Sequence, residues 1–143
     1  ANCKVINLRA VVYDGKHHPV DSSEMAFKIA GRAALREAIE SAKPQLLEPI
    51  MKLRIMFPDE YMGDISGDLN SRRGRILGMD REEGMQVVNA DLPMAEAFQY
   101  SNHLRSLTHG RGSFEMDFDR YEQVPSNLAQ QIKESVAQTQ AEE

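Results

Sequence analysis

One pattern occurs twice between residues 50 and 122, and it constrains the fold more than any other feature of the chain. In each copy a strand is followed by a proline, a helix, a turn of glycine and arginine, and a second strand. Two such units joined by a hairpin are typical of the split βαβ, or ferredoxin-like, arrangement. The repeat therefore predicts an α+β domain in which two helices cover one face of a four-stranded antiparallel sheet.

Hydrophobic periodicity places the elements of this domain. Met51, Leu53 and Ile55 alternate with polar or less buried positions, which predicts a half-buried first strand. A proline near the first turn favours a helix start at Pro58 and at Leu92-Pro93, and Gly74 is expected to end the first helix. The expected elements are strands at 50–56, 75–79, 85–90 and 114–118, helices at 58–72 and from 92, and a hairpin loop at 80–84.

The N-terminal segment has strand and turn signals followed by a helix start. Residues from Val5 to Tyr13 are rich in β-branched and apolar types, which predicts a strand, and Asp14-Gly15 has the composition of a turn. The run from Asp21 to Glu24 reads as a capping box, in which Asp21 accepts from the third helical N–H group and Glu24 reaches back to the first.

A helix is expected after this box. Met25, Ile29 and Ala33 recur at helical spacing and predict one buried face, and Pro44 lies just beyond the expected end. The apolar run 46–49 predicts a packed, stiff connection to the next domain.

The last residues predict a polar helix at 126–140, after Pro125. Its apolar side chains form a narrow stripe of Leu128, Ile132 and Val136, which needs a surface to pack on. The N-terminal segment is too small to close a core of its own. We therefore expect the tail helix to return to that segment.

Composition limits the class of protein. The chain has 143 residues, a net charge of −5, and no run of about 18 apolar residues such as a membrane helix requires. No signal-peptide pattern opens it, and the single Cys3 cannot form an internal disulfide, so a reducing cytoplasm is expected. An acidic chain is a poor indiscriminate binder of nucleic acid, although a local basic cluster can still contact RNA.

Lys16, His17 and His18 stand in the loop before the predicted helix. Three interpretations are open. Asp14 and Asp21 flank the histidines, which makes a metal site conceivable, but adjacent histidines on a short loop rarely face one ion. The loop can be solvated without a role, or an imidazole can stack on a base or donate to phosphate.

Basic residues recur where each helix leads into a strand. They are Arg72, Arg73 and Arg75 in the first half, and Arg105, His109 and Arg111 in the second. Arginine at a helix C-terminus is favoured by the helix dipole, which is the simpler explanation. The functional interpretation is a single basic edge that faces phosphate.

No catalytic constellation is found in the sequence. The acids Asp59, Glu60, Asp64 and Asp68 lie at helical spacing and indicate a solvated face, and no phosphate-binding loop or zinc motif is present. An acylphosphatase would need an arginine in the loop after the first strand, where this chain has 57–60, Phe-Pro-Asp-Glu. We therefore expect no enzyme activity, no cofactor and no metal in this chain itself.

Several long runs resemble the C-terminal part of elongation factor G, the ribosomal translocase. They are YDGKHHPVDSSEMAFKIAG (13–31), LLEPIMKL (46–53), PDEYMGDISGDLNSRRGRILGM (58–79), LPMAEAFQY (92–100) and LRSLTHGRGSFEMDFDRY (104–121). Gln99 stands where the family commonly has glycine. The resemblance implies that 1–46 is the second half of domain IV, which is similar to a domain of small-subunit ribosomal protein S5. It also implies that 47–123 is the ferredoxin-like domain V and that 124–143 is the C-terminal helix returning to domain IV.

The resemblance also implies a function. Domain IV of the family enters the decoding site beside the tRNA–mRNA, and the tip histidine maps to His18, with His17 where an aromatic residue is usual. Domain V leans on large-subunit RNA, which gives the Arg-Gly turns weight as RNA contacts. The expected partner is thus the ribosome, with no DNA or membrane, and GTP and Mg would belong to a GTPase domain outside this chain. A paralogue that acts in ribosome recycling or protection is the alternative.

Overall fold

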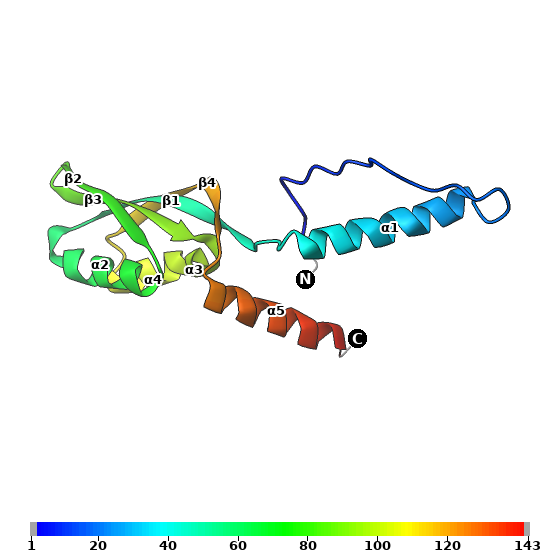
Figure 1. Cartoon of the computed structure of the whole chain (residues 1–143). Helices are drawn as coiled ribbons and strands as arrows, with labels where there is room; N and C mark the ends of the chain where they lie inside the picture. Colours follow the sequence, from blue (N-terminus) through cyan, green and yellow to red (C-terminus); the bar gives the residue numbers. More distant parts are fainter. Residues whose placement is uncertain (1–2, 142–143) are drawn as a thin grey trace. The chain divides into compact units, whose positions relative to one another are not determined.

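The computed structural model describes residues 3–141, and side chains up to residue 135. The chain divides into two units, one comprising 46–125 and the other 1–45 together with 126–143 (Figure 1).

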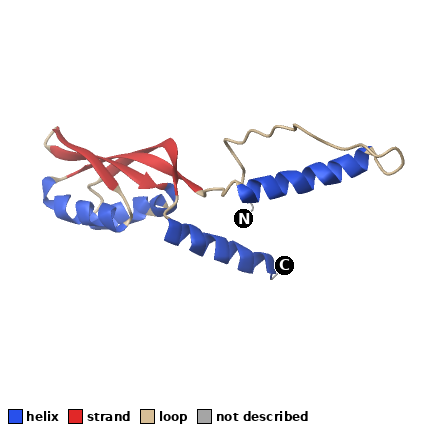
Figure 2. Cartoon of the chain, in the orientation of Figure 1, coloured by secondary structure: helices blue, strands red, loops and turns tan. Residues whose placement is uncertain are grey.

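The unit 46–125 is built on one antiparallel sheet. Its strands are β1 (Leu47–Phe57), β2 (Arg75–Glu82), β3 (Met85–Pro93) and β4 (Ser113–Gln123), in the order β2-β3-β1-β4. The helical segments η1 (Asp59–Tyr61), α2 (Met62–Ser71), α3 (Met94–Ala97) and α4 (Tyr100–Leu107) lie on one face of the sheet (Figure 2). This confirms the predicted α+β, ferredoxin-like arrangement.

The core lies between this sheet and its helices. Alternate residues of β1 face the helices, and Leu53 and Ile55 are almost completely buried there. The helices contribute Ile65 and Leu69 from α2, and Tyr100 from α4. Tyr100 packs edge-on against Phe114 of β4, with ring centroids 5.3 Å apart. The period-two pattern of β1 therefore predicted the buried face correctly.

The β2–β3 hairpin is tighter than the predicted loop at 80–84. The strands continue to Glu82 and from Met85, so only Glu83 and Gly84 form the turn, with φ of 50° and 83°. Two positive φ values are typical of a type I′ turn, whose twist matches that of the flanking strands.

The first helix ends at a close backbone contact. The N–H group of Gly74 donates to the carbonyl oxygen of Leu69 at 2.7 Å, and a Cβ at residue 74 would lie 2.7 Å from the same oxygen. Glycine is required here for space, and it directs the chain into β2.

The second predicted helix is wrong in its start and its continuity. Leu92 pairs with Met51 in the sheet and is completely buried, so β3 continues to Pro93. Helix α3 then ends, and α4 begins after Gln99, whose φ is 65°. This left-handed residue, in a conformation that glycine adopts more readily, interrupts the helix.

In the other unit, helix α1 (Glu24–Ser41) is present but its cap differs from the prediction. The N-cap is Ser23, whose Oγ accepts from the N–H group of Ala26 at 3.1 Å, rather than Asp21. Glu24 pairs with Lys28 at 2.6 Å instead of reaching back. No residue of α1 is buried, so the predicted buried face of Met25, Ile29 and Ala33 is also wrong.

The predicted strand at Val5–Tyr13 does not form within the described residues. This stretch is extended without a ladder, and Val12 and Tyr13 are 93% and 95% exposed. A strand is completed by hydrogen bonds to a neighbour, and no described segment supplies them. Strand propensity alone is therefore insufficient here.

The tail helix α5 (Ser126–Ala141) is present, as predicted. Leu128 and Ile132 are half-buried, whereas the side chain of Val136 lies outside the described residues. Its docking on the N-terminal segment stays a prediction.

Candidate functional site

The loop before α1 is held by its own polar groups. Asp14 Oδ1 accepts from the N–H group of Gly15 at 2.7 Å, and Ser22 Oγ accepts from the N–H group of His18 at 2.7 Å. The N–H group of Ser22 in turn donates to the His18 carbonyl oxygen at 3.1 Å. These contacts join residues close together in the sequence, so the loop and the start of α1 form one locally ordered segment.

The two adjacent histidines face different surroundings. The ring of His17 lies nearly parallel to that of Phe27 on α1, with centroids 6.4 Å apart. Nδ1 of His18 lies 3.1 Å from Asp21 Oδ2 and 3.3 Å from the Asp21 N–H group. Its side chain is 65% exposed, and among the described residues Nε2 has no partner. The ring of His18 is thus oriented through one nitrogen and presents the other, and exposed Lys16 stands two residues earlier in the same loop.

The first Arg-Gly turn is tied to carboxylates. Arg73 binds Glu48 through both terminal nitrogens, at 2.8 and 2.9 Å, and its Nε lies 3.3 Å from Glu96. Arg72 Nε donates to Asp68 at 2.9 Å. Bidentate pairs of this kind are strong and geometrically specific. The guanidinium groups of this turn therefore stabilise the domain through internal ion pairs.

Arg75 belongs to an ion cluster around the buried Asp91, which the sequence analysis missed. Asp91 Oδ2 accepts from Arg75 at 2.9 Å and from Arg120 at 2.8 Å, and the Asp91 side chain is only 6% exposed. Burial by itself would raise the pKa of Asp91, but the hydrogen bonds from Arg120 and Arg75 outweigh it and lower that pKa. The sequence signal that could have indicated this cluster is Asp91 itself, the single acidic residue in the largely buried strand β3.

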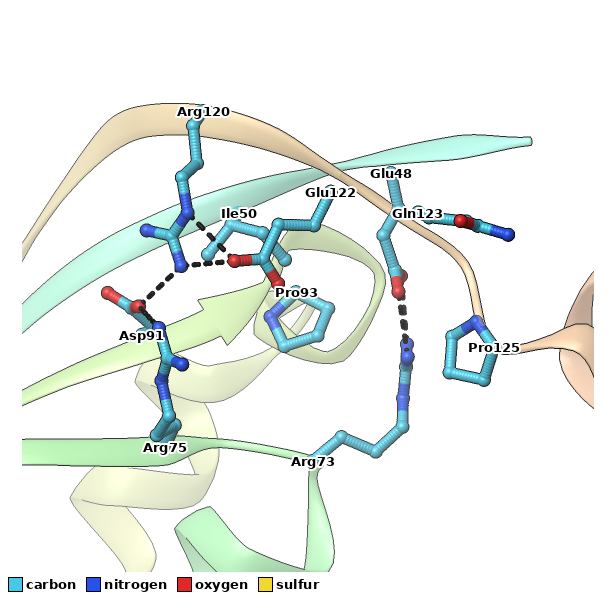
Figure 3. A pocket seen from close by; sticks show the side chains of 10 residues that line it. All are labelled: Glu48, Ile50, Arg73, Arg75, Asp91, Pro93, Arg120, Glu122, Gln123 and Pro125. Atoms are coloured by element: carbon cyan, nitrogen blue, oxygen red, sulfur yellow. Dashed lines mark hydrogen bonds and ion pairs between the residues drawn. The ribbon is translucent and has the colours of Figure 1, made fainter. Parts of the chain in front are cut away.

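A shallow hollow of about 240 Å³ opens beside this cluster on the face of the sheet away from the helices. Figure 3 shows that its guanidinium and carboxylate groups point toward one another across the hollow. It is lined by Glu48, Ile50, Arg73, Arg75, Asp91, Pro93, Arg120, Glu122, Gln123 and Pro125. Since its cations are already paired with acids, it is a poor phosphate cradle.

The second Arg-Gly turn is organised around Tyr61. Arg111 donates to Glu60 at 2.5 Å and also to the Tyr61 hydroxyl, and its guanidinium lies 5.0 Å from the centre of the Tyr61 ring. His109 meets the same ring edge-on at 6.2 Å. Arg105 is exposed on α4 and has no acidic partner among the described residues.

The two turns do not form a single basic edge. Arg75 starts β2 opposite Asp91, and Asp91 pairs with Lys52 at the middle of β1. Ser113 starts β4 opposite Met56, near the end of β1. In a split βαβ fold the two helix-to-strand turns enter the sheet from opposite ends, so the hypothesis of one shared edge is wrong.

Among the residues that the structure describes, no three His, Cys, Asp or Glu side chains gather as a metal site would require. No helix in this part of the chain is long and apolar enough to cross a membrane.

The fold defines an α+β protein in which a ferredoxin-like domain follows part of a second module. The family model described as elongation factor G C-terminus matches residues 45–132, and that described as elongation factor G, domain IV matches residues 1–43. The chain belongs to the elongation factor G family. A Thermus thermophilus protein of known crystal structure is 45% identical, with a TM-score of 0.74. The match covers 88% of this chain and 19% of that protein.

Proposed function

We propose that this chain is the C-terminal part of a ribosomal translocase, a binding and mechanical module whose tip loop enters the decoding site. The supporting observation is the loop of residues 16–21, which orders His18 through Nδ1 and leaves Nε2 exposed at the start of a capped helix. Such a group can donate to a phosphate or stack on a base. The proposal covers the ribosome as partner and the movement of tRNA and mRNA as the process.

The proposed mechanism is steric. Domain IV occupies the space that the tRNA leaves and so prevents backward movement, while a GTPase domain elsewhere in the parent protein supplies the nucleotide chemistry. Within the tip, His18 makes the contact and His17, which stacks on Phe27, supports the loop. Of the six basic residues at the two turns, Arg105 is the first to test for RNA binding. It has no acidic partner among the described residues, so it can contact RNA without breaking an internal ion pair.

The test is His18→Ala in the full-length parent, with His17→Ala as the matched control. Loss of one or two hydrogen bonds or a stacking contact would remove about 1–3 kcal/mol from a late state. This corresponds to a slowing of tRNA–mRNA movement by roughly 5- to 150-fold. Single-turnover translocation should show this loss, with a smaller loss for His17→Ala, while ribosome-stimulated GTP hydrolysis stays nearly unchanged. Equal losses of hydrolysis and movement in His18→Ala would contradict the proposal.

The same assay separates translocation from the paralogous roles. A recycling factor would split ribosomes after termination but support little tRNA–mRNA movement in the unmodified parent. A translocase would support movement, and only then is the effect of His18→Ala on that step meaningful.

A further inference from the structure

Strand β4 is the longer of the two edge strands, and it is open along one side. It has 11 residues and pairs only with β1 in the sheet order β2-β3-β1-β4. From Ser113 to Phe118 the register with β1 is regular, and it shifts only beyond that residue. The edge strand β2 is shorter, with eight residues, and its ladder is interrupted by an irregularity between Ile76 and Gly78, near its start. Regular edges are the ones that accept an additional strand.

The two faces of β4 differ in chemistry. Met116 and Phe118 lie opposite Leu53 and Met51, on the core side of the sheet, yet they remain 38% and 54% exposed. Phe118 also meets the ring of Tyr121, which is 55% exposed, at 5.3 Å. Apolar side chains on this face of β4 therefore extend beyond the part of the core that is buried.

The other face of β4 is acidic and incompletely neutralised. Asp117 lies opposite Lys52, but Lys52 Nζ binds Asp119 at 2.8 Å instead. Glu115 lies opposite Arg54, whose guanidinium binds Glu82 at 2.6 Å. Neither Glu115 nor Asp117 has a salt bridge among the described residues. Both carboxylates are exposed and available to a cation from outside the domain.

We propose that the free edge of β4 binds an extended protein segment in which basic and apolar residues alternate. Main-chain hydrogen bonds along Ser113–Phe118 would supply affinity, as in other cases of strand addition. Because side chains alternate between faces, the basic residues of such a segment would meet Glu115 and Asp117 while the apolar ones meet Met116 and Phe118. This binding mode goes beyond the proposed contacts with RNA.

Charge argues against a second copy of this chain as the occupant. Two β4 strands paired about a two-fold axis would bring the acids of one copy, Glu115 and Asp117, against those of the other. Like charges directly opposite one another destabilise a strand pair. The same acids that disfavour self-association favour a basic partner.

The probe is a short peptide of alternating lysine and valine, about nine residues long, which matches an ordinary strand. It is added to the 143-residue chain, and amide hydrogen exchange is followed by NMR. We expect exchange to slow at the outward-facing amides of Ser113–Phe118. A peptide of the same composition with its lysines in one block is the control for non-specific attraction.

Charge reversal gives the decisive comparison. The double variant Glu115→Lys with Asp117→Lys should weaken binding of the lysine peptide by about tenfold or more, and should instead bind a glutamate–valine peptide. The matched control, Asp80→Lys with Glu83→Lys on the β2 hairpin, should bind the lysine peptide as the unmodified chain does. Binding without protection of β4, equal binding of the blocked peptide, equal loss in the control variant, or dimerisation through β4 would each overturn the proposal.

Discussion

Helix α1 has 18 residues and buries none of them, whereas helix α2 has 10 residues and buries Ile65 and Leu69 completely. Both helices follow clear local start signals. The difference is that α2 lies against a sheet whose strands are all present in its unit, while the described residues around α1 supply no such surface. Local signals are thus sufficient to form a helix, but burial requires an opposing element.

The polar groups of the two units differ in the same way. Among the described residues the side chain of His18 makes polar contacts only with Val20 and Asp21, within three positions of itself, and its other ring nitrogen is left exposed. In the other unit, Arg73 reaches Glu48, 25 positions away, and Arg120 reaches Asp91, 29 positions away. Long-range ion pairs therefore stabilise the ferredoxin-like domain, and the loop is the more accessible polar surface.

The largest expected loss of stability comes from replacing a buried phenylalanine, with an exposed phenylalanine as the comparison. Phe57 is completely buried, and Phe57→Ala should destabilise the unit 46–125 by about 3–5 kcal/mol through cavity formation. Phe27 is 50% exposed on α1, and Phe27→Ala should cost less than about 1 kcal/mol. Urea unfolding, with hydrogen exchange to assign the loss to a unit, measures both. Similar losses for the two variants would show that α1 is covered after all.

The next effect tests the ion cluster. Asp91→Asn should cost about 1.5–3 kcal/mol at neutral pH, because Arg75 and Arg120 lose a charged acceptor. The folded-state pKa of Asp91 is lowered, so its stabilising contribution is present above about pH 4 and is lost as the pH falls through that lowered value. The variant should therefore have a flatter acid limb in a plot of unfolding free energy against pH.

Asp21→Asn is the control, since Asp21 is 81% exposed in the tip loop. It should change the unfolding free energy by less than about 0.5 kcal/mol at neutral pH. If Asp91→Asn leaves the low-pH part of the plot of unfolding free energy against pH unchanged, the ion cluster does not contribute to stability as predicted.

The smallest expected effects come from replacing two glycines by alanine. The two changes in unfolding free energy should have opposite signs. Gly74→Ala places a Cβ 2.7 Å from the Leu69 carbonyl oxygen and should cost about 1–2 kcal/mol. Gly31 lies inside α1 with nothing within 4 Å of an added Cβ, so Gly31→Ala should stabilise that helix by about 0.5–1 kcal/mol. Thermal unfolding followed by circular dichroism measures both, and destabilisation by Gly31→Ala would indicate a close neighbour on α1.

Several elements whose signals lie close together in the chain were predicted correctly from those signals alone. The duplicated strand–helix–strand pattern predicted the split βαβ domain, the alternation in β1 predicted its buried face, and the capping run predicted α1. Motif resemblance predicted the family. Each of these depends on residues close together in the chain, where propensity and periodicity act directly.

Pairings between distant residues, by contrast, became clear only in the folded chain. The predicted strand at Val5–Tyr13 remained unpaired because a ladder needs a neighbour, and Leu92 became a strand residue because Met51 lies opposite it. The two basic turns were separated to opposite ends of the sheet by its topology, and their arginines found acids up to 51 positions away. Hydrogen bonds and ion pairs between distant residues depend on how the chain returns to itself, and local patterns do not specify that return.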